Sequence, residues 1–402
     1  MIRKTENMDL GSRNTFGMKV RCRLFVEITE ESDLPELDFD SLPQPVFVMG
    51  GGSNLLFTGD FPGTVLHVAI DSFPAESAAG LSPKDVSTPG HVQGEGPAGD
   101  KGSQTPQETV GGAGVSKANG VPEGTVPAAD GSLKLRLGAG VVFDDFCAWA
   151  SAEDLWGPEN LSLIPGEVGA SAVQNIGAYG VEAKDIIETV HAWDRQERRF
   201  VDIPAADCGY GYRTSRFKTE WKGRFIITAV TFRLSRTPQP KLDYGGVRKA
   251  LEARLAAFGT EISDDSLTPR AIRGTIIGIR RQKLPDPEEI GSAGSFFKNP
   301  VISKEEFERI VAIAREDNGP EYVVPHFEVG DEIKVPAAWM IDQCGFKGER
   351  LGGAQVYPQQ PLVLVNATGR AVPEDVLALR DRIIRKIERK YGITLHCEVE
   401  TV

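Results

Sequence analysis

The chain has 402 residues, of which 40% are hydrophobic and 25% charged, and its formal net charge at pH 7 is -12. This length is too great for one ordinary core, so two or three domains are expected, and the composition is that of a soluble globular protein. The acidic balance argues against a nucleic-acid binder, and the absence of an apolar run of about 18 residues predicts no membrane span.

The termini and thiols point to a reducing compartment. Residues 1–17 contain no apolar segment of the kind that secretory signals carry, so a cytoplasmic chain is expected. The cysteines are odd in number and widely scattered, whereas disulfide frameworks and zinc ribbons need close pairs. We therefore expect reduced thiols and no metal site. The cysteines are Cys22, Cys147, Cys208, Cys344 and Cys397.

The first part of the chain reads as strands interrupted by a low-complexity segment. A short apolar strand at 45–49 leads into the glycine loop GGGSNLL at 50–56. Residues from about 72 to 132 are rich in Gly, Pro, Ser, Thr and Ala, and such a segment cannot bury enough surface to offset its ordering entropy. We predict a mobile surface insertion, with a domain linker as the alternative, because the flanks 65–71 and 133–140 both look like strands of one sheet.

Later elements alternate in type. Residues 144–155 predict a short helix, and 223–234 predict a strand. The prolines and glycines of 238–246 suggest a domain boundary. Beyond it, 303–316 predicts a helix with a Ser303–Glu306 capping box, 374–391 predicts a helix stopped by Gly392, and 393–402 predicts a final strand. Two α+β units fit this order better than one doubly wound sheet.

Two glycine-rich loops, 50–56 and 164–180, carry the functional signal. Neither has the Gly-Lys-Ser/Thr of a P-loop or the G-x-G-x-x-G of a dinucleotide fold. Glycine, serine and asparagine nevertheless let consecutive backbone N–H groups converge on a phosphate. Two such loops could therefore hold a pyrophosphate between them, although ordinary tight turns remain the alternative. The second loop, IPGEVGASAVQNIGAYG, has a single charged residue, Glu167.

Five motifs occur in one order: GGGSNLL, IPGEVGASAVQNIGAYG, YGYRTSRFK, GSAGSFFKNP and AAWMIDQCGFKG…GGAQVYPQQPLVLVN. Together they resemble the UDP-N-acetylenolpyruvoylglucosamine reductase family of peptidoglycan synthesis, from about Asn14 to Glu398 apart from the insertion. The resemblance implies an α+β fold. It has a two-lobed FAD-binding domain of the PCMH or vanillyl-alcohol-oxidase type over 1–235, a smaller α+β substrate-binding domain over 236–395, and a C-terminal strand, 396–402, that returns to the active site.

In that family the two loops enclose FAD. Neither loop here carries a His or Cys that could tether a flavin, so non-covalent binding is expected. The resemblance also implies NADPH as co-substrate and a monomeric, cytoplasmic enzyme, although no residue of the chain indicates NADPH over NADH. The expected cofactor contacts are Gly50, Gly51, Gly52, Ser53, Asn54, Leu55, Pro165, Gly166, Gly169, Ala170, Asn175, Gly177, Ala178 and Tyr179.

The resemblance further assigns the chemistry. Arg213 matches the family's active-site arginine, whose paired donors suit a carboxylate that gains charge. Ser295 matches the proton donor, and Glu398 matches a glutamate near the C-terminus. Cys397 stands where the family usually has proline, so Glu400 stays open as an alternative to Glu398.

Four further residues match substrate contacts in the family: Tyr244, which marks the subtype with a mobile flap, Lys283, Asn299 and Gln360, with Gln359 as the alternative to the last. The predicted activity is the NADPH-dependent reduction of UDP-N-acetylglucosamine enolpyruvate to UDP-N-acetylmuramate through FAD. Two alternatives remain: a flavin-dependent sugar or alcohol oxidase of the same FAD-domain class, and a non-catalytic nucleotide-binding protein.

Overall fold

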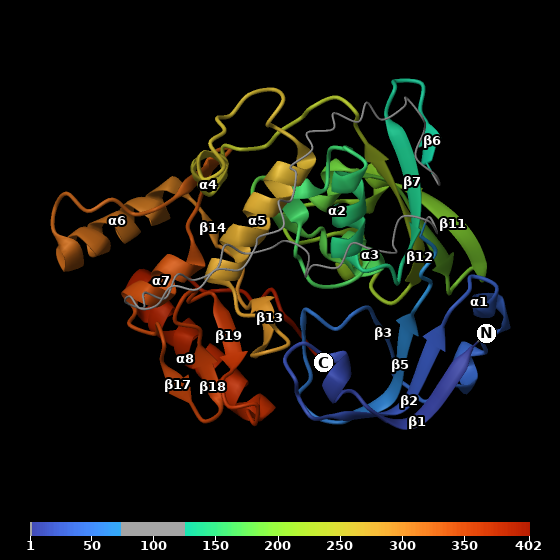
Figure 1. Ribbon diagram of the computed structural model, residues 1–402. Helices are drawn as coiled ribbons and strands as arrows, with labels where there is room; N and C mark the ends of the chain where they lie inside the picture. Colours follow the sequence, from blue (N-terminus) through green and yellow to red (C-terminus); the bar gives the residue numbers. More distant parts are fainter. Residues whose placement is uncertain (1, 74–124) are drawn as a thin grey trace, which may run out of the picture.

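A computed structural model describes residues 2–73 and 125–402 (Figure 1). The first sheet has the order β1-β2-β5-β3, in which β2, β5 and β3 are parallel and β1 is antiparallel to β2. The predicted strand at 45–49 is confirmed as β3. The bounds are β1 Arg3–Asp9, β2 Arg21–Ile28, β3 Val46–Met49 and β5 Phe61–Val68, with the short helix α1 at Asp33–Glu36.

The second sheet is antiparallel throughout, in the order β11-β10-β12-β7-β6. Helix α2 (Phe143–Ala152), which the sequence predicted, packs against it, and Phe146 stacks on Phe232 of β12 with ring centroids 4.6 Å apart. The alternate leucines of β7 are buried, as a period-two strand requires. The strands are β6 Thr125–Pro127, β7 Leu133–Gly138, β10 Ile187–Asp194, β11 Arg199–Pro204 and β12 Phe225–Leu234.

The predicted insertion needs two corrections. Its flanks β5 and β7 belong to different sheets, although Gly138 and Gly140 donate backbone hydrogen bonds to Ser72 and Ile70 just beyond β5. Its predicted end at residue 132 is too late, because β6 already pairs with β7. A three-residue strand shows too little periodicity to be detected in the sequence. The predicted mobility of the segment concerns 74–124, which lies outside the described residues.

The C-terminal part combines two small sheets, in the orders β13-β19-β18-β17 and β14-β16-β15, with five helices. Both predicted helices are confirmed: α6 begins at the Ser303–Glu306 capping box, and α8 ends at Gly392 with a φ of 71°. The bounds are α4 Val247–Ala256, α5 Pro269–Lys283, α6 Lys304–Asn318, α7 Ala337–Gln343, α8 Pro373–Tyr391, β13 Gly291–Ser295, β14 Val301–Ile302, β15 Phe327–Val329, β16 Glu332–Lys334, β17 Arg350–Leu351, β18 Ala354–Val356 and β19 Val363–Asn366.

The predicted C-terminal strand is shorter than expected. Only β20 (Glu400–Thr401) is a strand, and it runs parallel to β4 (Leu55–Leu56), directly after the first glycine loop. Upstream, Cys397 forms an isolated bridge with Phe297. The chain end therefore lies between the first sheet and the C-terminal part, as Figure 1 shows.

The buried clusters cut across the predicted division at residue 235. One core joins both sheets of the N-terminal half. A second core combines N-terminal residues such as Phe16 and Phe57 with the buried faces of α6, α7 and α8. The boundary therefore stays a prediction, because the N-terminal sheet buries one face against the C-terminal part of the chain.

Some simple features complete the fold. The cysteines are free thiols. Over 2–73 and 125–402 no group of three or more His, Cys, Asp or Glu side chains is arranged to hold a metal ion. Within the same ranges, none of the helices has the length and apolarity needed to cross a bilayer.

A buried ion pair joins α2 to α5. The two guanidinium nitrogens of Arg273 lie 2.6 and 3.0 Å from the carboxylate oxygens of Asp144, and both side chains are about nine-tenths buried. Removing one member of such a pair leaves an uncompensated charge in the interior. The pair therefore fixes α5 against the second sheet.

We predict that Asp144→Ala lowers the free energy of unfolding by about 3 kcal/mol, because Arg273 is left buried without its counter-ion. Urea titration of the purified chain measures this. The double variant Asp144→Ala/Arg273→Met should be less destabilised than the single one. Arg199→Ala, which removes an exposed pair with Glu197, is the control and should cost less than about 1 kcal/mol. Equal losses in Asp144→Ala and Arg199→Ala would contradict the prediction.

Candidate active site

The two glycine loops lie against each other. Ser53 Oγ donates a hydrogen bond to Pro165 O at 3.0 Å. A Cβ added to Gly51 would lie 3.5 Å from Gly166 Cα, and one added to Gly166 would lie 2.8 Å from Ser53 Oγ. Gly52 has a φ of 67°, and its added Cβ would lie 2.0 Å from Arg13 O. A side chain is therefore excluded at Gly52 by the backbone of Arg13 and crowded at Gly166 by Ser53, whereas at Gly51 a Cβ would make an ordinary contact.

The second stretch is not a continuous loop, contrary to the prediction. Residues Val168–Gln174 form the helix α3, followed by the short strands β8 (Gly177–Ala178) and β9 (Val181–Glu182). Gly169 lies in α3 at Ala139, where an added Cβ would meet Ala139 Cβ at 2.8 Å. Packing of helix on strand explains this glycine without a ligand. Small residues suit both a bare loop and a tightly packed helix, so composition could not separate the two.

Other predicted cofactor residues have structural roles as well. Asn175 caps α3 with a φ of 49°, and its buried amide donates to Glu182 and to Gly211 O and accepts from Lys184 N. Leu55 is buried in the second core. These side chains are occupied by the protein itself, so only their backbone groups remain for a ligand.

Arg213 and Glu398 meet beside the second stretch. Arg213 Nε lies 2.9 Å from Glu398 Oε1, although it is not aligned for a hydrogen bond and is left buried without one. The Arg213 guanidinium donates instead to the backbone oxygens of Gly177 and Asn175. Arg213 also has a φ of 55°, a conformation that costs a non-glycine residue about 1–2 kcal/mol. Strain of this kind clusters at functional sites.

The structure separates the two C-terminal glutamates. Glu398 points to Arg213 and accepts a hydrogen bond from Gln174 at 3.2 Å. Glu400 pairs at 2.7 Å with Lys222, whose side chain is 67% exposed. Asn54 of the first glycine loop donates to Glu398 O and accepts from Glu400 N. The geometry therefore favours Glu398 over Glu400 as the inward residue.

Ser295 ends β13 near this pair. The register of β13 against β19 shifts between Ser292 and Ser295, and Gly294, with a φ of 69°, has no atom within 4 Å of an added Cβ. Glu398 N donates to the carbonyl of the next residue, Phe296, at 2.9 Å. The serine thus follows a glycine that borders open space. Its strand is hydrogen-bonded to the segment that carries Glu398.

Two lysines and a glutamine that were not singled out in the sequence surround the pair. Lys218 donates to Gln174 Oε1, whose amide in turn donates to Glu398, and Lys298 Nζ donates to Arg213 O at 3.3 Å. Burial, followed by the charge of Lys298, lowers the pKa of Lys218. All three residues lie inside the quoted motifs, so the motif match contained the signal.

The side chains of Tyr212, Tyr244 and Phe327 form an aromatic wall on one side of Arg213. Tyr244 stacks on Phe327 with ring centroids 5.4 Å apart, and Lys334 Nζ lies over the rings of Tyr212 and Phe327 at 5.2 and 5.7 Å. Burial raises the pKa of Tyr244, and burial lowers the pKa of Lys334. Phe327 and Lys334 lie outside the quoted motifs, and sequence reasoning missed them.

The remaining predicted contacts differ in placement. Asn299 Oδ1 accepts from Ala337 N at 2.9 Å, which holds the start of α7. Gln360 is half-buried, whereas Gln359 is exposed. The backbone oxygen of Gln360 accepts a hydrogen bond from Val363 N, and Val363 is the β-ladder partner of Ser295. Lys283 is exposed at the end of α5. The structure gives it no contact with Arg213 or Glu398 among the described residues.

Arg280 lies on α5, three residues before the exposed Lys283. Its guanidinium is buried and meets the Tyr179 hydroxyl, and its Nε has no partner. Burial lowers the pKa of Arg280. Tyr179 lies at the end of the second stretch with a φ of 49°. An orphaned buried cation at this place fits a site for a polar or anionic group.

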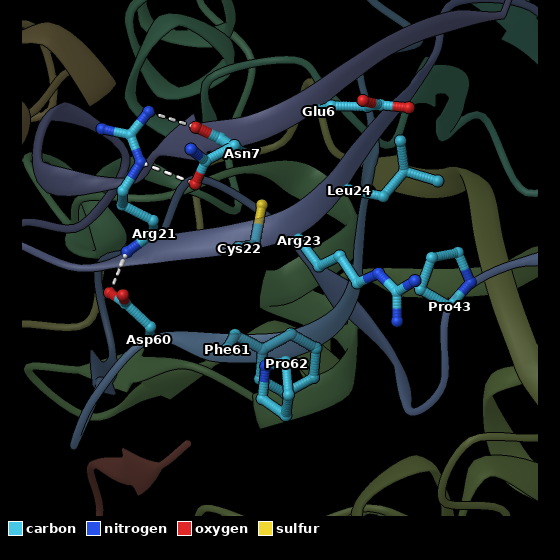
Figure 2. Close-up of a pocket in the computed structure, with 10 residues that line it drawn as sticks. All are labelled: Glu6, Asn7, Arg21, Cys22, Arg23, Leu24, Pro43, Asp60, Phe61 and Pro62. Carbon is cyan, nitrogen blue, oxygen red and sulfur yellow. Dashed lines mark hydrogen bonds between the residues drawn. The ribbon is translucent and has the colours of Figure 1, made fainter.

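Two hollows lie in the described part of the surface, and neither is lined by Arg213, Ser295 or Glu398. One of about 730 Å³ is lined by residues of β1, β2 and β5, where Arg21 is already bonded to Asn7 and Asp60 (Figure 2). It shares no residue with the glycine loops. A second, of about 400 Å³, is lined by 11–17, Gly51 and part of 287–369, and therefore borders the first glycine loop.

Known proteins are similar in sequence to this chain over nearly its whole length. A family model for the C-terminal domain of UDP-N-acetylenolpyruvoylglucosamine reductase matches residues 286–402, and one for an FAD binding domain matches 124–199. Reductases of that name from Bacteroides fragilis and Porphyromonas gingivalis are each 38% identical, over 99% of this chain and 99% and 98% of their own lengths. One from Burkholderia vietnamiensis is 37% identical over 97% of this chain and 94% of its own.

A solved structure supports the fold. That of UDP-N-acetylenolpyruvylglucosamine reductase from Thermus caldophilus has a TM-score of 0.58 and 18% sequence identity, and covers 100% of this chain and 98% of its own. A likeness at this identity shows the fold alone. Together with the domain models it confirms the predicted α+β class, with an FAD-binding domain of the PCMH type followed by the reductase C-terminal domain.

We predict that Gly52→Ala abolishes FAD binding and lowers the melting temperature, because the added Cβ would lie 2.0 Å from Arg13 O at the junction of the loops. Gly259→Ala is the matched control, since Gly259 has a similar φ of 69° but no atom within 4 Å. It should cost only the strain of about 1–2 kcal/mol. Flavin fluorescence titration and thermal unfolding measure both effects. FAD binding by Gly52→Ala as tight as by Gly259→Ala would show that the packing of the first glycine loop against Arg13 does not matter for FAD binding.

Proposed function

This chain belongs to the UDP-N-acetylenolpyruvoylglucosamine reductase family, and we propose that Arg213, Ser295 and Glu398 carry out the second half of the reaction. The reaction converts UDP-N-acetylglucosamine enolpyruvate to UDP-N-acetylmuramate in peptidoglycan synthesis, so the chain is an FAD-dependent oxidoreductase. The observation that carries the proposal is the 2.9 Å contact of Arg213 with Glu398. The segment that carries Glu398 is hydrogen-bonded to Phe296, next to Ser295, and to Asn54 of the first glycine loop.

The residues present fit the cofactor. The junction of the loops offers bare backbone that side chains would fill, and the orphaned Arg280 beside Tyr179 offers a buried cation. We propose that the backbone of 50–54, 165–166 and 177–179 holds FAD without a covalent bond. When bound, FAD supplies hydride transfer, taking a hydride from NADPH and passing it to the enolpyruvyl double bond. The preference for NADPH is inherited from the family.

Arg213 and Glu398 are suited to the charge that develops on the substrate. Hydride addition at the terminal carbon of the enolpyruvyl group moves negative charge onto its carboxylate, as in a conjugate addition. A guanidinium stabilises that charge with directed donors. Glu398 holds Arg213 in place, Gln174 donates a hydrogen bond to Glu398, and Lys218 in turn donates to Gln174. This arrangement orients the guanidinium before the substrate arrives.

Ser295 is the proposed proton donor to the adjacent carbon. A hydroxyl is a weak acid, so it donates only to a strongly basic carbon and only when well oriented. The bulge of β13 and the open space at Gly294 allow a substrate to approach the hydroxyl. Proton transfer completes the lactyl ether.

Substrate contacts are proposed on the aromatic wall. Tyr244 stacks on Phe327 and lies over Gly180, where an added Cβ would meet Tyr244 Cβ at 3.3 Å, which fits a flap that closes over the second stretch. Asn299 and Gln360 are proposed contacts to the sugar nucleotide. Lys283 remains a proposed contact to the diphosphate that requires the exposed end of α5 to face the substrate. A monomeric, cytoplasmic enzyme is also proposed.

We predict that Ser295→Ala leaves the reduction of bound flavin by NADPH intact and slows its reoxidation by the enolpyruvyl sugar about 10²–10⁴-fold, as expected for a lost acid. Anaerobic stopped-flow absorbance follows the two halves separately. If both halves slowed equally, the serine would be structural. Reduction only by a sugar alcohol, and not by NADPH, would favour an oxidase instead.

We predict that Glu398→Gln lowers turnover about 10²-fold or more, because Arg213 loses the anion that orients it. Glu400→Gln is the matched control on the same segment and should retain activity, since the Glu400 carboxylate pairs with the exposed Lys222. Steady-state rates with the UDP-sugar measure both. Loss of activity in Glu400→Gln with activity retained in Glu398→Gln would reverse the assignment.

A further inference from the structure

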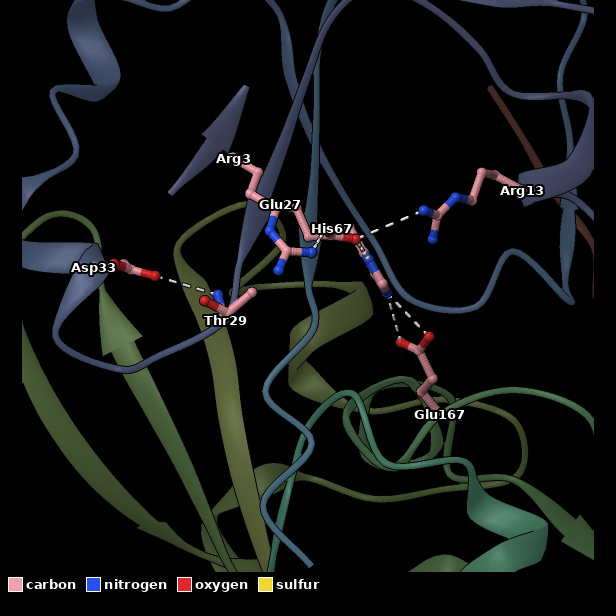
Figure 3. Close-up of polar contacts among 7 residues, drawn as sticks. All are labelled: Arg3, Arg13, Glu27, Thr29, Asp33, His67 and Glu167. Carbon is pink, nitrogen blue, oxygen red and sulfur yellow. Dashed lines mark hydrogen bonds and ion pairs between the residues drawn. The ribbon is translucent and has the colours of Figure 1, made fainter. Parts of the chain in front are cut away.

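A histidine joins the first sheet to the second glycine stretch. His67 on β5 lies beside Glu27 of the parallel strand β2, in register. Its Nδ1 is 3.4 Å from Glu27 Oε1, and its Nε2 is 3.0 and 3.2 Å from the two carboxylate oxygens of Glu167 (Figure 3). The side chain of His67 is only 9% exposed. The imidazole therefore bridges two carboxylates in a mostly buried place.

The geometry favours a proton on both ring nitrogens. An ionised carboxylate only accepts hydrogen bonds, and a neutral imidazole has a single N–H. Each ring nitrogen of His67 faces a carboxylate. In a neutral ring, one nitrogen would carry no proton, and its lone pair would face a carboxylate oxygen with no hydrogen between them. Burial lowers the pKa of His67, but the hydrogen bond and charge of Glu167, followed by Glu27, outweigh it, so the net pKa lies above its ordinary value of 6.5.

The charges around the bridge are unevenly shared. Glu27 also faces Arg13 at 3.7 Å and the largely exposed Arg3 at 3.4 Å. For Glu167, by contrast, His67 is the one ion-pair partner within the described parts of the chain. A neutral His67 would therefore leave the charge of Glu167 without a counter-ion.

Glu167 stands where the two glycine loops meet. A Cβ added to Gly50 would lie 3.3 Å from one carboxylate oxygen of Glu167, and one added to Gly51 would lie 3.4 Å from the other. Glu167 is also the one charged residue of the second stretch. A bare carboxylate at this junction would repel the pyrophosphate that the loops are proposed to bind.

We propose that His67 is a positioning residue of the flavin site, which as an imidazolium holds Glu167 and cancels the one negative charge that the glycine stretches present to the pyrophosphate of FAD. This inference rests on the proposed function, because it concerns FAD binding. It also gives a pH dependence. Because the folded-state pKa of His67 is raised, the imidazolium persists to higher pH than in a free histidine and is lost as the pH rises through that raised pKa, so FAD affinity falls on the alkaline side.

The test is FAD affinity of the deflavinated full-length chain between about pH 6 and pH 9, measured by flavin fluorescence. The wild-type affinity should fall as the pH rises. His67→Gln should bind FAD about ten-fold or more weakly at pH 6, since Glu167 is then unpaired. Glu167→Gln should bind FAD with little pH dependence, and His67→Gln/Glu167→Gln should recover most of the affinity lost in His67→Gln. A merely structural histidine would not be rescued by removing the carboxylate.

His191→Gln is the matched control. His191 also bonds a carboxylate, that of Asp202 at 2.6 Å, and Thr231 at 2.8 Å, on the second sheet rather than at the glycine loops. It should not change FAD affinity. ADP, which carries the pyrophosphate, should show the same dependence as FAD, whereas riboflavin, which lacks it, should not.

Thermal unfolding of each apo variant separates folding from binding. If His67→Gln does not fold, the wild-type pH profile and Glu167→Gln still decide the matter. Tight FAD binding with equal pH profiles in the wild type and Glu167→Gln would overturn the inference alone. A wild-type chain that binds no FAD at any pH would overturn the proposed function as well.

Discussion

The contact of two stretches of bare backbone, near residues 51 and 166, is the constraint on which the site depends. Gly51 and Gly166 lie side by side, and a Cβ added to Gly166 would come within 2.8 Å of Ser53 Oγ on the first loop. Ser53 Oγ also donates a hydrogen bond to Pro165 O, which joins the two loops. Two lobes with separate sheets can share one ligand only if their main chains approach in this way, because bulky residues would keep them apart.

The C-terminal segment brings the candidate catalytic residue Glu398 to the glycine loops. β20 pairs with β4 directly after the first glycine loop, and Asn54 hydrogen-bonds the backbone of residues 398 and 400. This places Glu398 against Arg213, which a left-handed backbone conformation holds beside β8. Asn54 and Glu398, 344 positions apart, thus become neighbours. The strain at Arg213 is offset by the surrounding hydrogen bonds to Gly177 and Asn175.

Two largely buried charged side chains near the site have a counter-ion, and a third has an unpartnered nitrogen. Arg273 is fully paired by Asp144, and Glu167 is paired by His67, whereas Arg280 keeps an unpartnered Nε. A buried charge without a counter-ion is costly. The Arg273–Asp144 pair therefore serves the fold, the His67–Glu167 pair neutralises a charge beside the glycine loops, and the unpartnered Nε of Arg280 marks a place where a ligand can supply a hydrogen-bond acceptor. The acidic net charge of the chain therefore says little about the polarity of its cleft.

The sequence alone determined the family, the fold class and the helices α2, α6 and α8, because capping, periodicity and motif content can be read from the residues themselves; it also singled out Arg213 and Ser295 as candidates and left Glu398 and Glu400 as alternatives. It did not determine that β5 and β7 belong to different sheets, that α3 interrupts the second glycine stretch, or that Arg280 turns inward while Lys283 stays exposed. Those features, the choice of Glu398 over Glu400 and the His67–Glu167 bridge were decided by tertiary structure, because each depends on distances between segments far apart in the chain, which no local pattern encodes.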